Sequence, residues 1–207
     1  MTGSPPCDAF SVLRHIGKNK RTAQEEADKL AGGREHSQAA VKAYRSQMTR
    51  GRLFLHEHPK SAASWKEPEI EALCAEDGVY YVSGPMCRWE LMPDHSQEPV
   101  GYARKETGWL TNSRWIAHTL DKECTKKMHG KAWHRHVELW GKKAKEAAKY
   151  LLPLVRAVLR ALRSELREGE IGSIDHGPSP HEPLISAQEE PIAEELENYW
   201  DDVRGGG

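Results

Sequence analysis

The sequence has few features of a secreted, membrane-spanning or disulfide-stabilised protein. None of its four cysteines forms a C-x-x-C pair, so neither a disulfide scaffold nor a zinc ribbon is indicated; they are Cys7, Cys74, Cys87 and Cys124. No run approaches the roughly 18 apolar residues that a membrane span requires, and the N-terminus lacks the basic-then-apolar order of a signal peptide. We therefore expect an intracellular protein, cytoplasmic or nuclear, without a membrane partner.

Charge is nearly balanced overall but is divided sharply along the chain. The formal net charge is -1, yet from Glu165 onward there are 12 acidic and 2 basic residues, which leaves 28 Lys and Arg against 19 Asp and Glu before them. A basic body suits phosphate contacts with nucleic acid, and a solvated lysine-rich surface is the other interpretation. We expect residues 1–165 to form the folded domain and residues 166–207 a mostly disordered acidic tail.

Hydrophobic periodicity predicts alternating helices and strands. Residues 22–50 have helical spacing, and Gly32 and Gly33 divide them into two predicted helices. The run RLFLH (52–56) is predicted as a strand that delivers Glu57 to its carboxyl end, followed by a helix at 68–75 and a buried strand at 79–82. This order favours an α/β layered sheet over a helical bundle or a sandwich.

The remainder of the body continues this pattern. Residues 93–99 are predicted as a loop, and residues 107–120 as a strand passing into a helix that Asn112 or Ser113 caps. Residues 137–166 are predicted as one long C-terminal helix that Pro153 kinks or divides. Because ligands bind outside the carboxyl ends of strands in open α/β sheets, we expect Cys7 and Glu57 on one rim.

Three segments resemble, in order, motifs of the cytosine DNA methyltransferases that act at ring carbon 5. SPPCDAFS (4–11) resembles their Pro-Cys nucleophile loop, and FLHEHP (54–59) resembles their strand-end Glu-Asn-Val or Glu-Asn-Pro motif. ARKETGWLTNS (103–113) resembles the Arg/Lys-Lys-Pro-Thr-x-x-x-Thr-Asn segment of a divergent branch associated with phages and mobile elements. This chain has His58 where the family has Asn, and Glu106 where the branch has Pro.

The resemblance implies a partial Rossmann-like methyltransferase sheet flanked by helices, and it implies roles for six residues. Cys7 would be the nucleophile that adds to ring carbon 6 of a flipped cytosine. Glu57 would be the general acid at ring nitrogen 3. The substrate-binding residues would be Ser4, Pro6, Arg104 and Lys105.

The resemblance also implies S-adenosylmethionine as the methyl donor. The family holds this cofactor on elements that precede the cysteine loop, and the sequence begins at that loop. The glycines at 32–33 and 205–207 follow no predicted strand and lack the G-x-G-x-x-G pattern. We therefore expect a partner chain or an upstream segment to supply the donor site, DNA to be a partner, and the isolated chain to be inactive.

A segment rich in Cys and His raises the question of a metal. Cys124, His129, His134 and His136 lie within 13 residues, zinc accepts such ligands, and Cys87 offers a further thiolate. The spacing matches no common zinc finger, which favours a surface or capping role. No metal ligand is therefore assigned from the sequence, and zinc is the metal to consider.

Two other function classes remain open. The basic body suits a non-catalytic nucleic-acid-binding protein derived from a mobile element. The other class is a cysteine hydrolase in which His56 or His58 acts as a base toward Cys7. No oxyanion-binding motif accompanies these residues.

Overall fold

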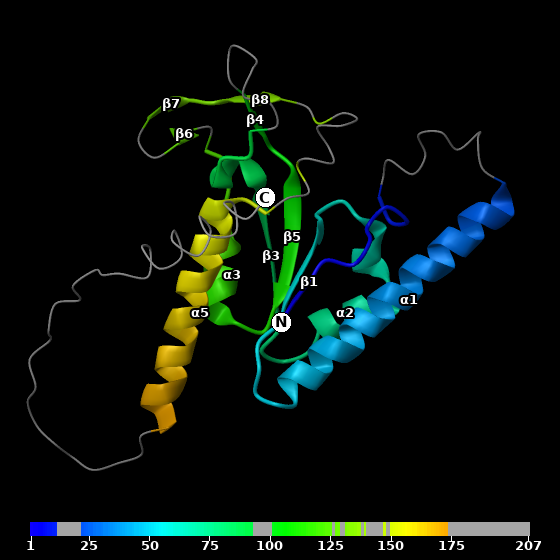
Figure 1. Cartoon of the computed structure of the whole chain (residues 1–207), viewed down its shortest axis with the longest axis horizontal. Helices are drawn as coiled ribbons and strands as arrows, with labels where there is room; N and C mark the ends of the chain where they lie inside the picture. Colours follow the sequence, from blue (N-terminus) through cyan, green and yellow to red (C-terminus); the bar gives the residue numbers. More distant parts are fainter. Residues whose placement is uncertain are drawn as a thin grey trace, which may run out of the picture. The chain divides into compact units, whose positions relative to one another are not determined.

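A four-stranded mixed sheet lies at the centre of the computed structural model (Figure 1). Its order is β1 (Thr2–Gly3), β2 (Leu55–Pro59), β5 (Glu106–Thr111) and β3 (Tyr80–Pro85). β1 pairs with β2 in parallel, and β5 runs antiparallel to both of its neighbours. The structure describes residues 1–11, 22–92, 101–125, 127–128, 131–137, 139, 147 and 150–173.

Helices cover both faces of this sheet. α1 (Ala23–Met48) and α2 (Pro68–Cys74) lie on one side, and α3 (Arg114–Leu120) and α5 (Leu152–Ser173) on the other (Figure 1). Successive residues of β5 point to opposite faces, so Trp109 belongs to the apolar cluster under α3 and α5, and Leu110 to the cluster under α1 and α2. The predicted α/β class is confirmed.

Two smaller sheets and two short 3-10 helices complete the described elements. β4 (Gly101–Ala103) pairs in parallel with β8 (Arg135–Val137), and β6 (Lys127–Met128) pairs with β7 (Lys131–Trp133). The 3-10 helices are η3 (Ala63–Lys66) and η4 (Met86–Trp89). β4 leads through two residues into β5, so the smaller β4–β8 sheet is joined directly to the central one.

Residues 22–50 contain a single helix, α1, so the predicted division at Gly32 and Gly33 is wrong. Thr22 and Glu25 form a capping box at the start of α1. A Cβ atom on Gly33 would lie 2.8 Å from the Cβ of Ala9 and 3.1 Å from the ring of Phe10. Gly33 therefore allows the segment after Cys7 to approach α1 closely, and it does not break the helix.

The strand predicted at 52–56 is displaced toward the carboxyl end. The backbone at Phe54 is satisfied by side chains, because its N–H donates to Asn112 Oδ1 at 2.8 Å and its carbonyl accepts from the Thr111 hydroxyl. Pairing with β5 then runs from Leu55 to Pro59, so Glu57 lies within β2. The strand predicted at 79–82 is β3, an edge strand with exposed Tyr80 and Tyr81, so it is less buried than expected.

Two predicted helices are confirmed and a third begins later than expected. The helix at 68–75 is α2, and Ser113 caps α3 by accepting from the Ile116 N–H at 3.1 Å. The helix predicted from Val137 is wrong at its start, because Val137 ends β8 and α5 begins at Leu152. Pro153 occupies the first turn, where a proline costs no helical hydrogen bond, so it neither kinks nor divides the helix.

Two predictions concern residues that the structure does not describe. The predicted loop at 93–99 and residues 174–207, which include most of the predicted tail, lie outside the described residues. Of the helices that the structure describes, none combines the length and the apolar composition of a membrane span.

The two adjacent glycines of α1 provide a matched test of the contact between this helix and the cysteine loop. We expect Gly33→Ala to lower the free energy of unfolding by about 1–3 kcal/mol, because the added methyl group overpacks against Ala9. Gly32 has no neighbouring atom within 4 Å, so Gly32→Ala should stabilise the helix by up to about 1 kcal/mol. Urea unfolding measures both changes, and equal stabilisation by both would show that the close approach at Gly33 is absent.

Candidate functional site

The loop that follows β1 carries Cys7 and is fixed on several sides. A Cβ atom on Gly3 would come within 2.0 Å of the Tyr44 hydroxyl oxygen, so this position has no room for a side chain. The carbonyl of Pro5 lies 2.8 Å from His58 Nε2 and can only accept, so His58 donates there. The Phe10 N–H donates to the Cys7 carbonyl at 3.0 Å. The thiol is therefore held at the carboxyl end of β1.

β2 places a buried carboxyl group beside this loop. Glu57 is 8% exposed, and its Oε2 accepts a hydrogen bond from the Ser4 hydroxyl at 2.7 Å. The Lys105 ammonium lies 3.7 Å from Oε1. A desolvated carboxylate needs partners in place of water. Ser4 and Lys105 supply them, so they stabilise the charged form of Glu57 and orient its side chain.

The Cys7 thiol responds electrostatically to the same groups. Burial raises the pKa of Cys7, the Glu57 carboxylate raises it further, and the Lys105 ammonium lowers it. The Cys7 thiol is therefore protonated at neutral pH. Cys7, Glu57 and Lys105 interact electrostatically within one site, although Glu57 lies within β2 and not at its carboxyl end, where it was predicted.

Tyr150 is a member of this site that the sequence analysis missed. Burial and the Glu57 carboxylate raise the pKa of Tyr150 to about 12, and its hydroxyl hydrogen-bonds with Ser4. The carbonyl of Ala147 nearby accepts from the Lys105 ammonium at 3.3 Å. Residues 147–150 were predicted as helix interior, and no motif marks Tyr150, so only the tertiary structure identifies it.

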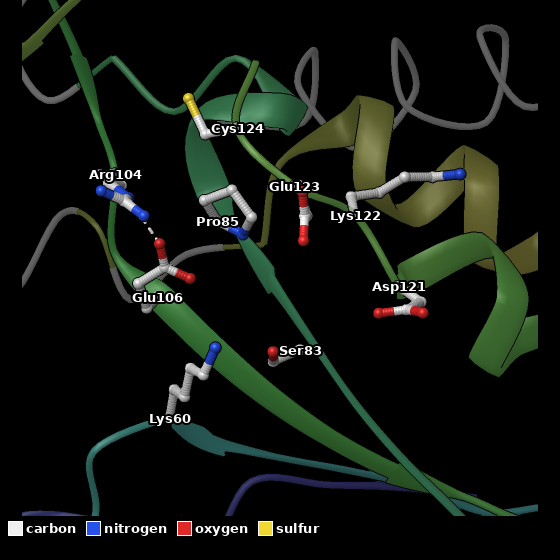
Figure 2. A pocket seen from close by; sticks show the side chains of 9 residues that line it. All are labelled: Lys60, Ser83, Pro85, Arg104, Glu106, Asp121, Lys122, Glu123 and Cys124. Atoms are coloured by element: carbon white, nitrogen blue, oxygen red, sulfur yellow. Dashed lines mark hydrogen bonds and ion pairs between the residues drawn. The ribbon is translucent and has the colours of Figure 1, made fainter. Parts of the chain in front are cut away.

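The structure divides the predicted substrate-binding residues. Ser4 and Lys105 contact Glu57, and Pro6 is exposed in the loop between Pro5 and Cys7. Arg104 instead pairs with Glu106 and lines a different cavity (Figure 2). This separation is physically reasonable because neighbouring residues of an extended chain point in opposite directions.

The cavity that Arg104 lines has a volume of about 600 Å³ and a mixed charge. Three basic and three acidic residues line it: Lys60, Arg104 and Lys122, and Glu106, Asp121 and Glu123 (Figure 2). Opposite charges in equal number give no net attraction for a phosphate group. Neither Cys7 nor Glu57 lines this cavity, whereas Cys124 does.

Both histidines of β2 are buried, and each already has a structural partner. His56 Nδ1 lies 3.0 Å from the Tyr44 hydroxyl, and burial lowers the pKa of His56 to about 3, with a further contribution from His58. His58 uses both ring nitrogens, because Nδ1 lies 2.6 Å from the Ser64 hydroxyl and Nε2 donates to Pro5. This arrangement argues against either histidine as the base of a cysteine hydrolase.

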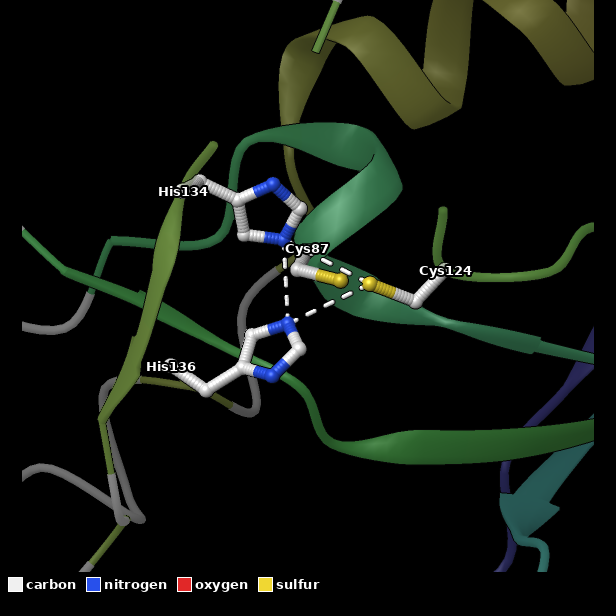
Figure 3. A group of neighbouring side chains, drawn as sticks. All are labelled: Cys87, Cys124, His134 and His136. Carbon is white, nitrogen blue, oxygen red and sulfur yellow. Dashed lines mark hydrogen bonds between the residues drawn. The ribbon is translucent and has the colours of Figure 1, made fainter. Parts of the chain in front are cut away.

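A second group of side chains has the composition of a metal site (Figure 3). One ligand atom from each of Cys87, Cys124, His134 and His136 lies within 4.8 Å of the other three. Cys124 Sγ is 3.5 Å from His134 Nε2 and 3.3 Å from His136 Nε2, and the two Nε2 atoms are 2.9 Å apart. His129, predicted as another candidate ligand, lies outside the described residues.

The four members of this group come from three segments of the chain. Cys87 lies in η4 and is fully buried, and Cys124 follows α3. His134 directly precedes β8 and His136 lies within it, so these alternate residues are on one side of the extended chain. Burial and a hydrogen bond with Cys124 raise the pKa of Cys87 to about 12. The structure thus contains a Cys/His group that can hold a metal ion.

In comparisons with family models, curated proteins and solved structures, none matched this chain.

The charges around Cys7 predict opposite effects of two substitutions. Glu57→Gln removes a negative charge that raises the pKa of Cys7, so it should lower that pKa, and Lys105→Met should raise it. The rate of Cys7 alkylation by iodoacetamide as a function of pH, read by mass spectrometry of the Cys7 peptide, measures both shifts.

Cys74, which lies in α2, serves as the internal reference thiol in the same samples. Its profile should be unchanged by either substitution. Identical Cys7 profiles in the parent and both variants would show that the carboxyl, ammonium and thiol groups do not form one electrostatic unit.

Proposed function

We propose that this domain is the target-base half of a DNA cytosine-5 methyltransferase-like protein, meaning the half that holds and activates a flipped cytosine. The observation that carries the proposal is the buried Glu57 carboxyl group, oriented by Ser4 and Lys105, beside the Cys7 thiol whose pKa it raises. The parallel β1–α1–β2 unit supports a partial Rossmann-like sheet, because such folds are built from strand–helix–strand units with ligands at the carboxyl strand ends.

The proposed reaction requires a thiolate and a carboxyl group of the protein to act on the same base. The Cys7 thiol loses its proton to solvent, and its sulfur then forms a bond to ring carbon 6. The carbon 5–carbon 6 π pair becomes the carbon 4–carbon 5 double bond, and the carbon 4–nitrogen 3 π pair moves onto nitrogen 3. Nitrogen 3 then takes a proton from Glu57, whose carboxylate first takes up a proton from solvent. Carbon 5 is then electron-rich, and this is the position that the resembled family methylates.

The surrounding residues have defined parts in this step. The Ser4 hydroxyl and the Lys105 ammonium hold the Glu57 side chain from two sides, so the proton donor has a fixed direction. The positive charge of Lys105 also favours the thiolate of Cys7 over its thiol. Tyr150 hydrogen-bonds with Ser4 and so belongs to the same group of side chains. A base that enters must leave the DNA stack.

The described residues do not fit S-adenosylmethionine. The glycines at 32 and 33 lie inside α1 and form no strand-to-helix turn. We propose that a partner chain or a segment outside this sequence holds the methyl donor. Because none of the four cysteines forms a disulfide, we further propose an intracellular location, either cytoplasmic or nuclear.

The second candidate is a non-catalytic nucleic-acid-binding protein derived from a mobile element. It is favoured by the excess of Lys and Arg over Asp and Glu before Glu165. In that case the Cys7 loop would be an inherited structure without chemistry. The two candidates both bind DNA but differ in whether Cys7 forms a bond to a base.

A covalent trapping experiment separates the two candidates. The probe is a pool of DNA duplexes and single strands of random sequence in which pyrimidin-2-one replaces one cytosine; this base lacks the amino group and adds thiolates readily at carbon 6. We expect a protein–DNA adduct by mass spectrometry. Cys7→Ser should abolish the adduct, and Glu57→Gln should slow its formation by roughly 10²-fold or more, because general acid catalysis is lost.

Cys74→Ser is the matched control and should form the adduct at the parent rate. DNA binding that weakens with salt but yields no adduct would support the second candidate and contradict the first. Methylation of DNA by the purified chain with S-adenosylmethionine would place a donor site within this chain and would contradict the assignment of only one half.

A further inference from the structure

We propose that Cys87, Cys124, His134 and His136 bind one Zn²⁺ ion in a closed, structural site. The inference is independent of the proposed function, because it rests on another group of side chains. It also differs from the sequence-based interpretation, in which the Cys- and His-rich segment had a surface or capping role.

The distances between the ligand atoms fit a tetrahedral shell around one ion. Zn–S bonds of about 2.3 Å and Zn–N bonds of about 2.0–2.1 Å place tetrahedral ligands roughly 3.3–3.8 Å from one another. Cys124 Sγ lies 3.5 and 3.3 Å from the two Nε2 atoms, within this range, whereas the two Nε2 atoms, 2.9 Å apart, are closer than it. All four ligand atoms lie within 4.8 Å of one another. The side chains therefore converge on one point (Figure 3).

The chemistry of the donor set selects the metal. Two thiolates and two imidazoles are soft and borderline ligands, which suit zinc and exclude the oxygen-seeking Mg²⁺ and Ca²⁺. Two thiolate charges also neutralise Zn²⁺, so the buried complex carries no net charge and its desolvation is tolerable. Four protein ligands fill a tetrahedron, which leaves no position for a substrate and marks the site as structural.

The backbone around the ligands is already ordered by hydrogen bonds. The Met86 N–H, next to Cys87, donates to the Arg104 carbonyl at 3.0 Å, and the Ala103 N–H donates to the Leu91 carbonyl at 2.7 Å. These bonds tie η4 to β4. β4 pairs with β8, where Tyr102 lies opposite His136. The ring of Tyr102 also packs edge-on against His134 at 5.4 Å. Cys87 and His136 thus lie on η4 and β8, which are both connected by hydrogen bonds to the β4 segment.

The proposed role of the ion is to join three segments that lie far apart in the sequence. β4 and β8 have three residues each, and a two-stranded sheet of this size is not stable alone. A zinc ion bound through η4, the segment after α3 and β8 fastens this sheet to the central domain. Zinc binding and the folding of this region are then coupled.

The test begins with the metal content of the full chain, purified under reducing conditions and reconstituted with Zn²⁺. We expect about one zinc per chain by elemental analysis and native mass spectrometry. Co²⁺ substitution should give the intense visible bands of tetrahedral cobalt and a thiolate-to-cobalt charge-transfer band in the near ultraviolet. Chelation should lower the melting temperature and expose two further thiols, those of Cys87 and Cys124, to alkylation.

Variants assign the ligands. Cys124→Ser and His136→Ala should lose the stoichiometric zinc and the tetrahedral cobalt spectrum, whereas His136→Cys should keep both because a thiolate replaces an imidazole. Cys74→Ser and Cys7→Ser are matched cysteine controls and should bind zinc as the parent does. Because the cobalt spectrum of the parent requires no variant, the test stands even if a ligand variant fails to fold.

Three results would overturn the proposal. These are the absence of zinc after reconstitution, an octahedral cobalt spectrum, and a Cys87–Cys124 disulfide under reducing conditions with no metal bound. Equal loss of zinc from the Cys74→Ser control would likewise remove the assignment of ligands.

Discussion

The parallel pairing of β1 with β2 is the constraint on which the candidate active site depends. Only Thr2 and Gly3 pair, with Leu55 and His56, and the Met1 ammonium extends the contact by donating to the Leu53 carbonyl at 2.7 Å. Parallel strands end at the same edge, so this short pairing sets the loop after β1 beside the second half of β2. So short a pairing is weak alone. Three further contacts hold the loop in place. Gly3 lies close to Tyr44, Gly33 lies close to Ala9, and His58 donates a hydrogen bond to the Pro5 carbonyl.

His58 illustrates how a departure from a family motif can be explained by its contacts. The resembled motif has Asn after the glutamate, and this chain has a histidine with both ring nitrogens engaged, one with Ser64 and one with Pro5. An imidazole reaches two partners on opposite sides of its ring, so it links η3 to the backbone next to Pro6 and Cys7. Burial lowers the pKa of His58, which keeps the ring neutral. Its part in the proposed function is to position the loop.

The sequence predicted elements where local signals and tertiary structure agree, and it failed where packing decides. The capped start of α3 and the proline-initiated α2 follow from short-range rules and were confirmed. Gly33 and Pro153 were read as helix breakers, but one serves a close contact and the other a first turn. For the sites, Cys7 and Glu57 stood in recognisable segments. Tyr150 had no such signal, and Cys87 lies far from the Cys- and His-rich segment, so its nearness to Cys124 depends on how η4 packs.

The two candidate sites meet along one stretch of chain, and this explains why a structural metal would matter to a distant thiol. β4 pairs with β8 next to the proposed zinc ligands, and the chain leaves β4 through Arg104 and Lys105 before it enters β5. The carbonyls of both residues accept from the Met86 N–H, beside Cys87, so η4 fixes the backbone at that bend. Lys105 then reaches the Ala147 carbonyl and the Glu57 carboxylate. The Lys105 charge lowers the pKa of Cys7. The hydrogen bonds that order η4 and the end of β4 therefore influence the position of a charge that acts on the thiol. The proposed zinc ion would therefore influence the Cys7 thiol through the position of Lys105, and not by contact with Cys7.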